Sequence, residues 1–168
     1  MYQNKDHTNQ KHIVIKSNNI DVSNQKSLLE ISKKISKLLN KGTNLFLYGE
    51  IGVGKTTFAR FLINQLQAQH NIKISEVLSP TFNILNEYQI NNLNVKHYDL
   101  YRIKKKGELE NIGLFDEKDA INIIEWPEIL ISLNVKYIKF DFTYSKDFKN
   151  RNLIISSNYN NKINDEFK

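Results

Sequence analysis

The segment that most constrains this chain is a glycine-rich stretch, GEIGVGKTT, at residues 49–57. It matches the pattern G-x-x-x-x-G-K-[ST] in full, and it lies between an apolar run at 44–48 and an amphipathic stretch that continues to about residue 70. Glycines let backbone N–H groups curl around a phosphate, and the start of the following helix adds unpaired N–H groups. The segment therefore predicts a strand, a phosphate-binding loop and a helix, and with them a site for a nucleoside triphosphate.

The side chains of this loop indicate different tasks. We expect the Lys55 ammonium to reach the β- and γ-phosphates and the Thr56 hydroxyl to bind Mg²⁺. The remaining loop residues expected to contact the nucleotide are Gly49, Gly52, Val53, Gly54 and Thr57.

Two acidic residues can complete such a site, because each follows an apolar run that is typical of a buried strand. Glu125 closes the run at 120–125, and Asp99 closes the run at 93–99. A carboxylate at such a strand end can hold Mg²⁺ through water or orient the attacking water. Each also has a structural interpretation: Glu125 as a surface glutamate and Asp99 as an Asx turn at a strand exit.

The rest of the chain alternates between strand-like and helix-like patterns, which favours an α/β sheet. We expect an N-terminal polar tail at 1–11, one domain at 12–157, and a loosely held polar tail at 158–168. Predicted helices cover 27–39, 55–70 and 107–114. Predicted strands cover 12–16, 44–48, 73–77, 82–88, 93–99, 120–125, 137–143 and 152–156.

Composition narrows the class of protein. The chain has 24 Lys and Arg against 18 Asp and Glu, for a net charge of +6, which fits either a polyanionic partner or the Lys- and Asn-rich drift of AT-rich codons. The absence of cysteine excludes disulfides, thiolate zinc sites and a cysteine nucleophile, and it fits a reducing compartment. Because the start is polar and no apolar run reaches about 20 residues, we expect a soluble, cytoplasmic protein without membrane contact.

Four segments in order resemble one family. They are GEIGVGKTT (49–57), SPTFNILNEY (79–88), HYDLYR (97–102) and IIEWPE (123–128). This set is similar to TsaE, also called YjeE, a family of small bacterial ATPases of tRNA threonylcarbamoyladenosine biosynthesis, and the resemblance runs from about residue 23 to 156. It implies a P-loop NTPase-like three-layer α/β fold, with a mostly parallel central sheet and an antiparallel hairpin portion, and it implies ATP and Mg²⁺ as ligands.

The resemblance also implies roles for single residues. Lys55, Asp99 and Glu125 would be catalytic, with Glu125 and Thr56 linked to Mg²⁺. The SPTF segment would be a nucleotide-sensitive switch, and a second switch would follow Glu125. The further residues that would lie near the nucleotide are Ser27, Ser79, Thr81, Trp126 and Arg151.

Family resemblance further implies that ATP hydrolysis, slow in the isolated chain, supports turnover of a complex of TsaD- and TsaB-like proteins. That complex transfers the threonylcarbamoyl group to the adenosine 3′ of the anticodon, so tRNA would be met indirectly. A nucleotide-dependent interaction module without significant hydrolysis is the alternative. A GTPase is disfavoured because the nearest base-reading string, 161–164, lacks the required aspartate, and a kinase because three scattered arginines make a poor lid.

Aromatic residues and one histidine near these motifs have two interpretations each. Phe82, Tyr88, Tyr98 and Tyr101 could stack on bases, or they could pack in a core, which is the expectation for Phe82, while Tyr88 and Tyr101 stay open. His97 shares a strand face with Asp99, so it could relay a proton or bind a metal. A hydrogen-bonded structural histidine is the favoured interpretation.

Overall fold

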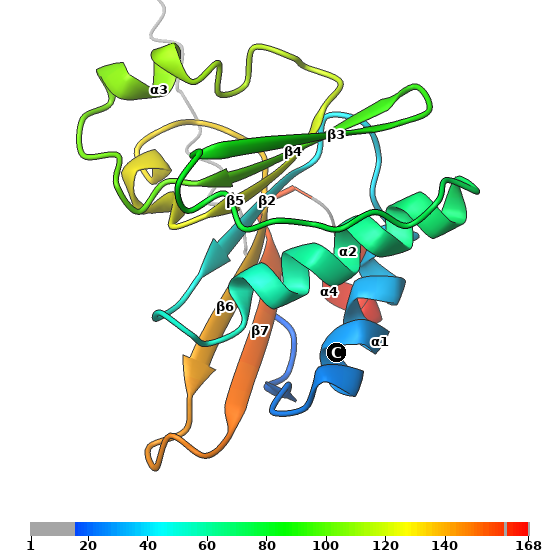
Figure 1. Ribbon diagram of the computed structural model, residues 1–168. Helices are drawn as coiled ribbons and strands as arrows, with labels where there is room; N and C mark the ends of the chain where they lie inside the picture. The colour runs from blue at the N-terminus through cyan, green and yellow to red at the C-terminus, as the bar shows by residue number, and fades with distance from the viewer. Residues whose placement is uncertain (1–15, 160, 168) are drawn as a thin grey trace, which may run out of the picture.

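The computed structural model describes residues 16–159 and 161–167, which form one seven-stranded sheet with helices on both faces (Figure 1). The strand order is β1-β7-β6-β2-β5-β4-β3. The strands are β1 (Ile20–Asp21), β2 (Asn44–Tyr48), β3 (Leu85–Ile90), β4 (Leu93–Asp99), β5 (Ile121–Glu125), β6 (Ile138–Tyr144) and β7 (Arg151–Ser157).

The centre of the sheet is parallel and its margins are antiparallel. Strands β4, β5, β2 and β6 pair in parallel, whereas β3 pairs antiparallel with β4, and β7 pairs antiparallel with both β6 and β1. This confirms the mostly parallel sheet with an antiparallel hairpin portion. Because parallel strands end at the same edge, the loops after β2, β4 and β5 come together there.

Helices divide the molecule into layers. Figure 1 shows α1 (Gln25–Ser36), α2 (Lys55–Gln69) and α4 (Asn161–Glu166) on one side of the sheet, with α3 (Gly107–Asn111) on the other. The short 3₁₀ helix η1 (Pro127–Leu130) packs with the smaller hydrophobic core on the α3 side. Side chains alternate between faces along each strand, so Ile123 packs toward α2 whereas Ile124 packs in the core beside α3.

The strand predicted at 73–77 is wrong. No ladder pairs these residues; instead the Ser75 N–H donates to Oε1 of Gln67 on α2 (3.1 Å), and the Val77 carbonyl accepts from Nε of Arg60 (2.9 Å). Side chains of α2 thus satisfy backbone groups that a neighbouring strand would otherwise satisfy. The segment runs along α2 as an irregular strap toward the SPTF motif.

The expectation of a loose tail at 158–168 is also wrong for its described part, because α4 packs against β7 with Ile163 and Phe167 buried. Ile163 lies in α4 and Phe167 directly follows the helix, and both side chains belong to the larger core. The strand expected at 12–16 lies outside the described residues except for Lys16, which bridges to Ser156.

Phe82 corrects a further expectation. Its side chain is 85% exposed rather than part of the core, because it sits in the turn before β3 and not within the strand.

In the described part of the chain, no helix combines the length and the apolar character needed to cross a membrane.

Candidate functional site

The phosphate-loop motif forms the turn between β2 and α2, as the sequence predicts. Gly49 adopts φ of +135°, and a Cβ there would lie 2.5 Å from the Phe142 carbonyl oxygen, so only glycine fits the start of the turn. Gly54 caps α2 with φ of +117° and Val53 is buried beneath the loop. The loop is therefore pinned to the sheet at its start and to the helix at its end.

Lys55 begins α2 and folds back over its own loop. Its Nζ donates to the carbonyl oxygens of Gly49 (2.6 Å) and Glu50 (2.9 Å), and it lies 3.8 Å from the centre of the Trp126 ring. Burial lowers the pKa of Lys55, and the nearby carboxylates of Glu125 and Asp99 oppose that shift. The ammonium thus sits in the loop with partners that a phosphate group can replace.

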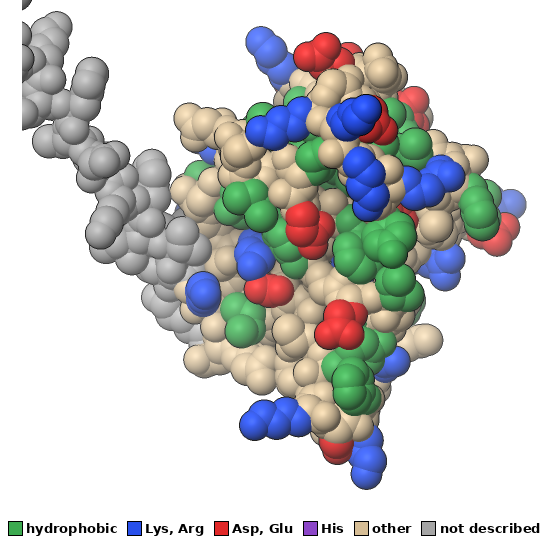
Figure 2. All heavy atoms as spheres, turned by 90° about the vertical axis from the view of Figure 1, so that its left-hand side faces the viewer, with side chains coloured by type: hydrophobic (Ala, Val, Ile, Leu, Met, Phe, Trp, Pro, Cys, Tyr) green, Lys and Arg blue, Asp and Glu red, His purple; other side chains and the backbone are tan. Residues whose placement is uncertain are grey.

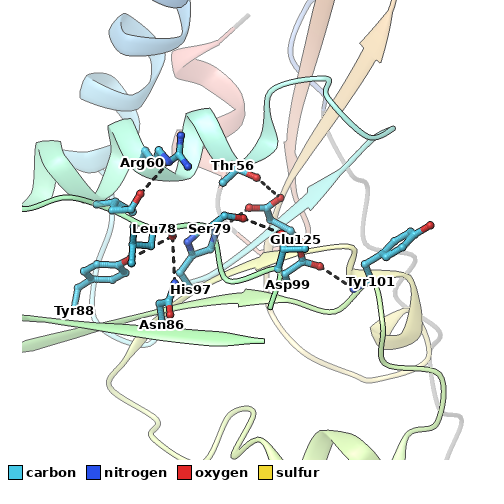
Figure 3. A network of polar contacts seen from close by, with 12 residues as sticks. Thr56, Arg60, Leu78, Ser79, Asn86, Tyr88, His97, Asp99, Tyr101 and Glu125 are labelled. Carbon is cyan, nitrogen blue, oxygen red and sulfur yellow. Dashed lines mark hydrogen bonds and ion pairs between the residues drawn. The ribbon is translucent and has the colours of Figure 1, made fainter. Parts of the chain in front are cut away.

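Glu125 and Thr56 meet beside the loop, as Figure 3 shows. The Thr56 hydroxyl donates to Oε2 of Glu125 at 2.9 Å, and His97 Nε2 lies 2.9 Å from Oε1 of the same carboxylate. Glu125 is 2% exposed, so it is a buried group and not the surface glutamate of the alternative interpretation. His97 is the hydrogen-bonded, buried histidine that the sequence favoured.

Asp99 occupies the matching position on the next strand, since Asp99 and Glu125 are register partners in the parallel β4–β5 pair. Its Oδ2 accepts from the Thr81 hydroxyl (3.0 Å), and the Ser79 and Thr81 hydroxyls are 2.8 Å apart. Its Oδ1 accepts from the Tyr101 N–H at 3.0 Å, which is an Asx turn. The Asx turn expected as the structural interpretation of Asp99 is therefore present, and the same carboxylate also holds the SPTF segment.

The strap before the SPTF motif is tied to both neighbouring elements. The Leu78 carbonyl accepts from the Asn86 amide (3.2 Å) and from the Tyr88 hydroxyl (3.5 Å), while Arg60 holds Val77 from α2. Figure 3 shows these contacts next to the Asp99 and Glu125 carboxylates. Tyr88 thus supports the strap and packs on the larger core. The aromatic residues considered for base stacking do not form one platform, because Tyr98 is fully buried on the other side of the sheet.

A pocket of about 700 Å³ opens beside the first half of the loop. Trp126, in a left-handed conformation with φ of +58°, lines it with Tyr101, and the two ring centres are 4.9 Å apart. Three carboxylates, those of Glu50, Glu128 and Asp141, belong to lining residues, so the pocket disfavours an anionic group. The side of the molecule on the left of Figure 1, seen in Figure 2, carries both acidic and basic side chains among hydrophobic ones.

Ser27 and Arg151 lie on other elements, each beside a residue that contacts the loop. Ser27 lies in the first turn of α1, where its N–H donates to the Asn24 side chain (2.9 Å), and the next residue, Leu28, lies 3.6 Å from where a Gly54 Cβ would stand. Arg151 lies over the Tyr144 ring at 5.6 Å, and its Nε is buried without a hydrogen-bond partner among the described residues.

Sequence reasoning did not find Tyr144. Its hydroxyl donates to the Ile51 carbonyl at 3.4 Å, so it connects the end of β6 to the loop. Its only sequence signal is that it directly follows the strand predicted at 137–143, and no motif marks this tyrosine.

Thr57, the last residue of the loop motif, is half-buried in the first turn of α2.

The donor set fits Mg²⁺ held partly by substrate and water. No cluster of three or more His, Asp or Glu side chains able to hold a metal occurs within 16–159 and 161–167. Mg²⁺ in nucleotide sites commonly uses one or two protein oxygens plus phosphate oxygens and waters. The adjacent oxygens of Thr56 and Glu125, 2.9 Å apart, supply that number.

Comparison with known proteins gives one family. The family described as threonylcarbamoyl adenosine biosynthesis protein TsaE matches residues 22–153. The tRNA threonylcarbamoyladenosine biosynthesis protein TsaE of Haemophilus influenzae is 33% identical over 152 residues, covering 82% of this chain and 89% of that protein. The protein of that name from Borreliella burgdorferi is 34% identical over 128 residues, covering 74% and 89%.

A shorter match and a solved structure agree with this. The TsaE of Rickettsia felis is 32% identical over 113 residues, which are 65% of this chain and 62% of that protein. A crystal structure of YdiB from Bacillus subtilis superposes with a TM-score of 0.67 at 23% identity, covering 90% of this chain and 91% of that one. The superposition shows that the two chains share a fold.

Proposed function

Since this chain belongs to the TsaE family of tRNA threonylcarbamoyladenosine biosynthesis proteins, we propose that it binds and hydrolyses Mg·ATP at the 49–57 loop. The product of this chemistry is not the modified nucleoside itself. Hydrolysis resets a complex of TsaD- and TsaB-like proteins in the cytoplasm, so that the complex modifies successive tRNA molecules.

One observation carries the proposal: Thr56, Asp99 and Glu125 meet at the carboxyl ends of β4 and β5, next to the loop that holds Lys55. A phosphate loop alone serves many functions. Carboxylates on two neighbouring strands, beside a hydroxyl in the first helical turn, supply oxygen ligands for Mg²⁺ and a group to orient the attacking water, which in-line hydrolysis of a terminal phosphate uses.

The residues divide the work as follows. Lys55 releases the carbonyls of Gly49 and Glu50 and turns its charge to the β- and γ-phosphates. Glu125 and Thr56 hold the metal shell, and Asp99 or Glu125 orients the attacking water. When bound, Mg²⁺ neutralises charge that develops on the terminal phosphate oxygens.

The state of the site reaches the SPTF segment through Asp99. The Thr81 hydroxyl donates to the Asp99 carboxylate, so an attacking water that donates to the same oxygen displaces Thr81 and loosens the SPTF segment. The exposed Phe82 ring belongs to that segment and moves with it, so a partner protein that binds this hydrophobic side chain can sense the movement.

The test is multiple-turnover tRNA threonylcarbamoylation by a TsaD–TsaB pair, with ATP, with and without this chain. The variant is Lys55→Ala, and the matched control is Lys33→Ala, which removes the same charge from an exposed position on α1. We expect the wild type and Lys33→Ala to sustain turnover and Lys55→Ala to allow about one round.

Other outcomes separate the alternatives. If the wild type supports turnover without significant hydrolysis, the chain acts as a nucleotide-dependent interaction module. Hydrolysis that is lost in Glu125→Ala and Asp99→Ala rejects that alternative. If the chain hydrolyses ATP in a Lys55-dependent manner without affecting the yield of modified tRNA, its ATP hydrolysis serves a process other than this tRNA modification.

A further inference from the structure

His97 is the most deeply buried ionisable side chain near the loop, with no exposed surface, and the mechanism above gives it no task. We propose that His97 is a positioning residue that fixes the carboxylate plane of Glu125 through an Nε2–H···Oε1 hydrogen bond. The proposal rests on the proposed function in one respect: it takes Glu125 as the acid that holds the metal shell.

The sheet register places His97 for this task. His97 and Asp99 lie on the same face of β4, and Glu125 pairs with Asp99 on β5, so the imidazole reaches diagonally across the parallel pair to Glu125. Figure 3 shows the ring lying between the strap and the carboxylate. A rigid central strand therefore carries the group that holds the acid.

Glu125 is held at both oxygens, and the two contacts differ in kind. The Oε2 contact comes from Thr56, whose hydroxyl the metal shell also needs, so Oε2 lies at the reacting side. The Oε1 contact comes from His97 and faces the protein interior. Two contacts fix the plane of a carboxylate, whereas one leaves it free to turn about that contact, so removing His97 frees Glu125 to rotate.

The hydrogen on the ring can be assigned from the surroundings. Nδ1 of His97 is buried and has no hydrogen-bond partner within the described residues. A carboxylate that holds a metal shell only accepts hydrogen bonds, so the 2.9 Å contact to Oε1 of Glu125 calls for a hydrogen on Nε2 of His97. Nε2 therefore carries it and donates to the carboxylate, as outer-shell groups do for metal-holding carboxylates and histidines.

The decisive comparison is His97→Gln against His97→Leu. Glutamine keeps an N–H donor near the position of Nε2, whereas leucine keeps the volume and loses the donor. Tyr98→Phe is the matched control, because it removes a buried hydroxyl contact (3.4 Å to the Gly113 carbonyl) one residue away on the opposite face of β4. All three are measured with the full chain.

We expect His97→Leu to lower kcat about 10- to 100-fold and to weaken Mn²⁺ binding to the ADP complex, followed by EPR, by a similar factor. ATP affinity without metal and KM stay within about threefold. His97→Gln recovers most of both losses, and Tyr98→Phe leaves both unchanged. Equal losses in folded Gln and Leu variants, or none in Leu, would overturn the proposal.

A second measurement needs neither ATP hydrolysis nor a variant that folds well. Two-bond ¹⁵N–¹H NMR spectra of the wild-type chain without nucleotide report which ring nitrogen of His97 carries hydrogen. We expect hydrogen on Nε2, and a form with hydrogen on Nδ1 alone would overturn the proposal. If hydrolysis is absent in the wild type while the Mn²⁺ and NMR results hold, the proposed ATPase fails and the positioning role of His97 stands.

Discussion

The Lys55 ammonium lies 3.8 Å from the centre of the Trp126 ring while it donates to two carbonyls of its own loop. Lys55 begins α2 and Trp126 follows β5, so this cation–π contact joins the phosphate loop to the segment that carries Glu125. A phosphate that attracts Lys55 must therefore weaken a contact to the one tryptophan in the chain.

Nucleotide binding should change the fluorescence of Trp126. We expect a shift in intensity or wavelength on adding ATP, because the cation over the ring moves toward the phosphates. Lys55→Met removes the cation beforehand, so the emission of that variant starts from a different value and stays flat. Lys104→Met is the control, since Lys104 lies over Tyr101 outside the loop (5.2 Å). A flat wild-type titration, with binding shown by calorimetry, contradicts this prediction.

The lowered pKa of Lys55 predicts two trends of opposite sign. Between its pKa in the folded chain and the higher value in the unfolded chain, ordinarily 10.5, the unfolded chain binds more protons. Stability of the nucleotide-free protein attributable to Lys55 therefore rises with pH in that range. ATP affinity falls over the same range, because the neutral amine no longer attracts phosphate.

Denaturant unfolding and ATP titrations in alkaline buffers, with Lys55→Met as reference, test both trends. The difference in unfolding free energy between the wild type and the variant should change with pH in the wild type's favour. Parallel curves for the two proteins would show that burial does not lower this pKa.

Sequence patterns predicted which candidate site residues lie together better than they predicted the contacts that support them. The loop, Thr56, Asp99 and Glu125 follow from spacing and strand ends, because parallel strands and a glycine-rich turn bring such residues to one edge. Tyr144 and the strap contacts of Arg60 did not follow, since they join segments distant in sequence through carbonyl groups, which no residue pattern encodes.

Two incorrect predictions of secondary structure, the strand at 73–77 and the loose tail at 158–168, have the same origin. Residues 73–77 have a strand-like composition, but whether a strand forms depends on a free neighbouring strand, and here α2 satisfies the backbone instead. Residues 161–166 are mostly polar, which favoured a loose tail. A short helix can nevertheless pack on a sheet with few apolar residues. The buried Ile163 is sufficient here because β7 offers it a covered position.

Asp99→Asn should separate hydrolysis from binding. The amide keeps the size of Asp99 and loses the charge, so we expect hydrolysis to fall at least about 10-fold while ATP affinity changes little. An Asp99→Asn variant that hydrolyses normally assigns the water-orienting role to Glu125 alone.

Thr81→Val, which removes the hydroxyl that donates to Asp99, should leave the carboxylate in place and loosen the SPTF segment. Proteolysis within 79–84 should then become faster in Thr81→Val without nucleotide.

Gly49→Ala should destabilise the protein by about 2 kcal/mol or more. The backbone at residue 49 is in a left-handed conformation, and a Cβ there would lie 2.5 Å from the Phe142 carbonyl oxygen. Gly107→Ala is the opposite case: it lies in α3, its φ is not positive, and nothing lies within 4 Å of the added Cβ. That variant should gain roughly 0.4–1 kcal/mol. Urea unfolding of the two variants measures the contrast, and equal stabilities would contradict the loop geometry.

Ile163→Ala tests whether α4 belongs to the core. Ile163 is fully buried among residues of the larger core, so truncation should cost about 2–4 kcal/mol and lower the unfolding temperature by roughly 5–15 °C. Ile131→Ala removes the same atoms at a position 72% exposed and should cost under about 0.5 kcal/mol. Because α4 lies on β7, away from the strand ends that carry Asp99 and Glu125, ATP affinity below the transition should be unchanged in both variants. Calorimetric unfolding temperatures that match for the two variants would mean that residues 161–166 do not pack on β7 in solution.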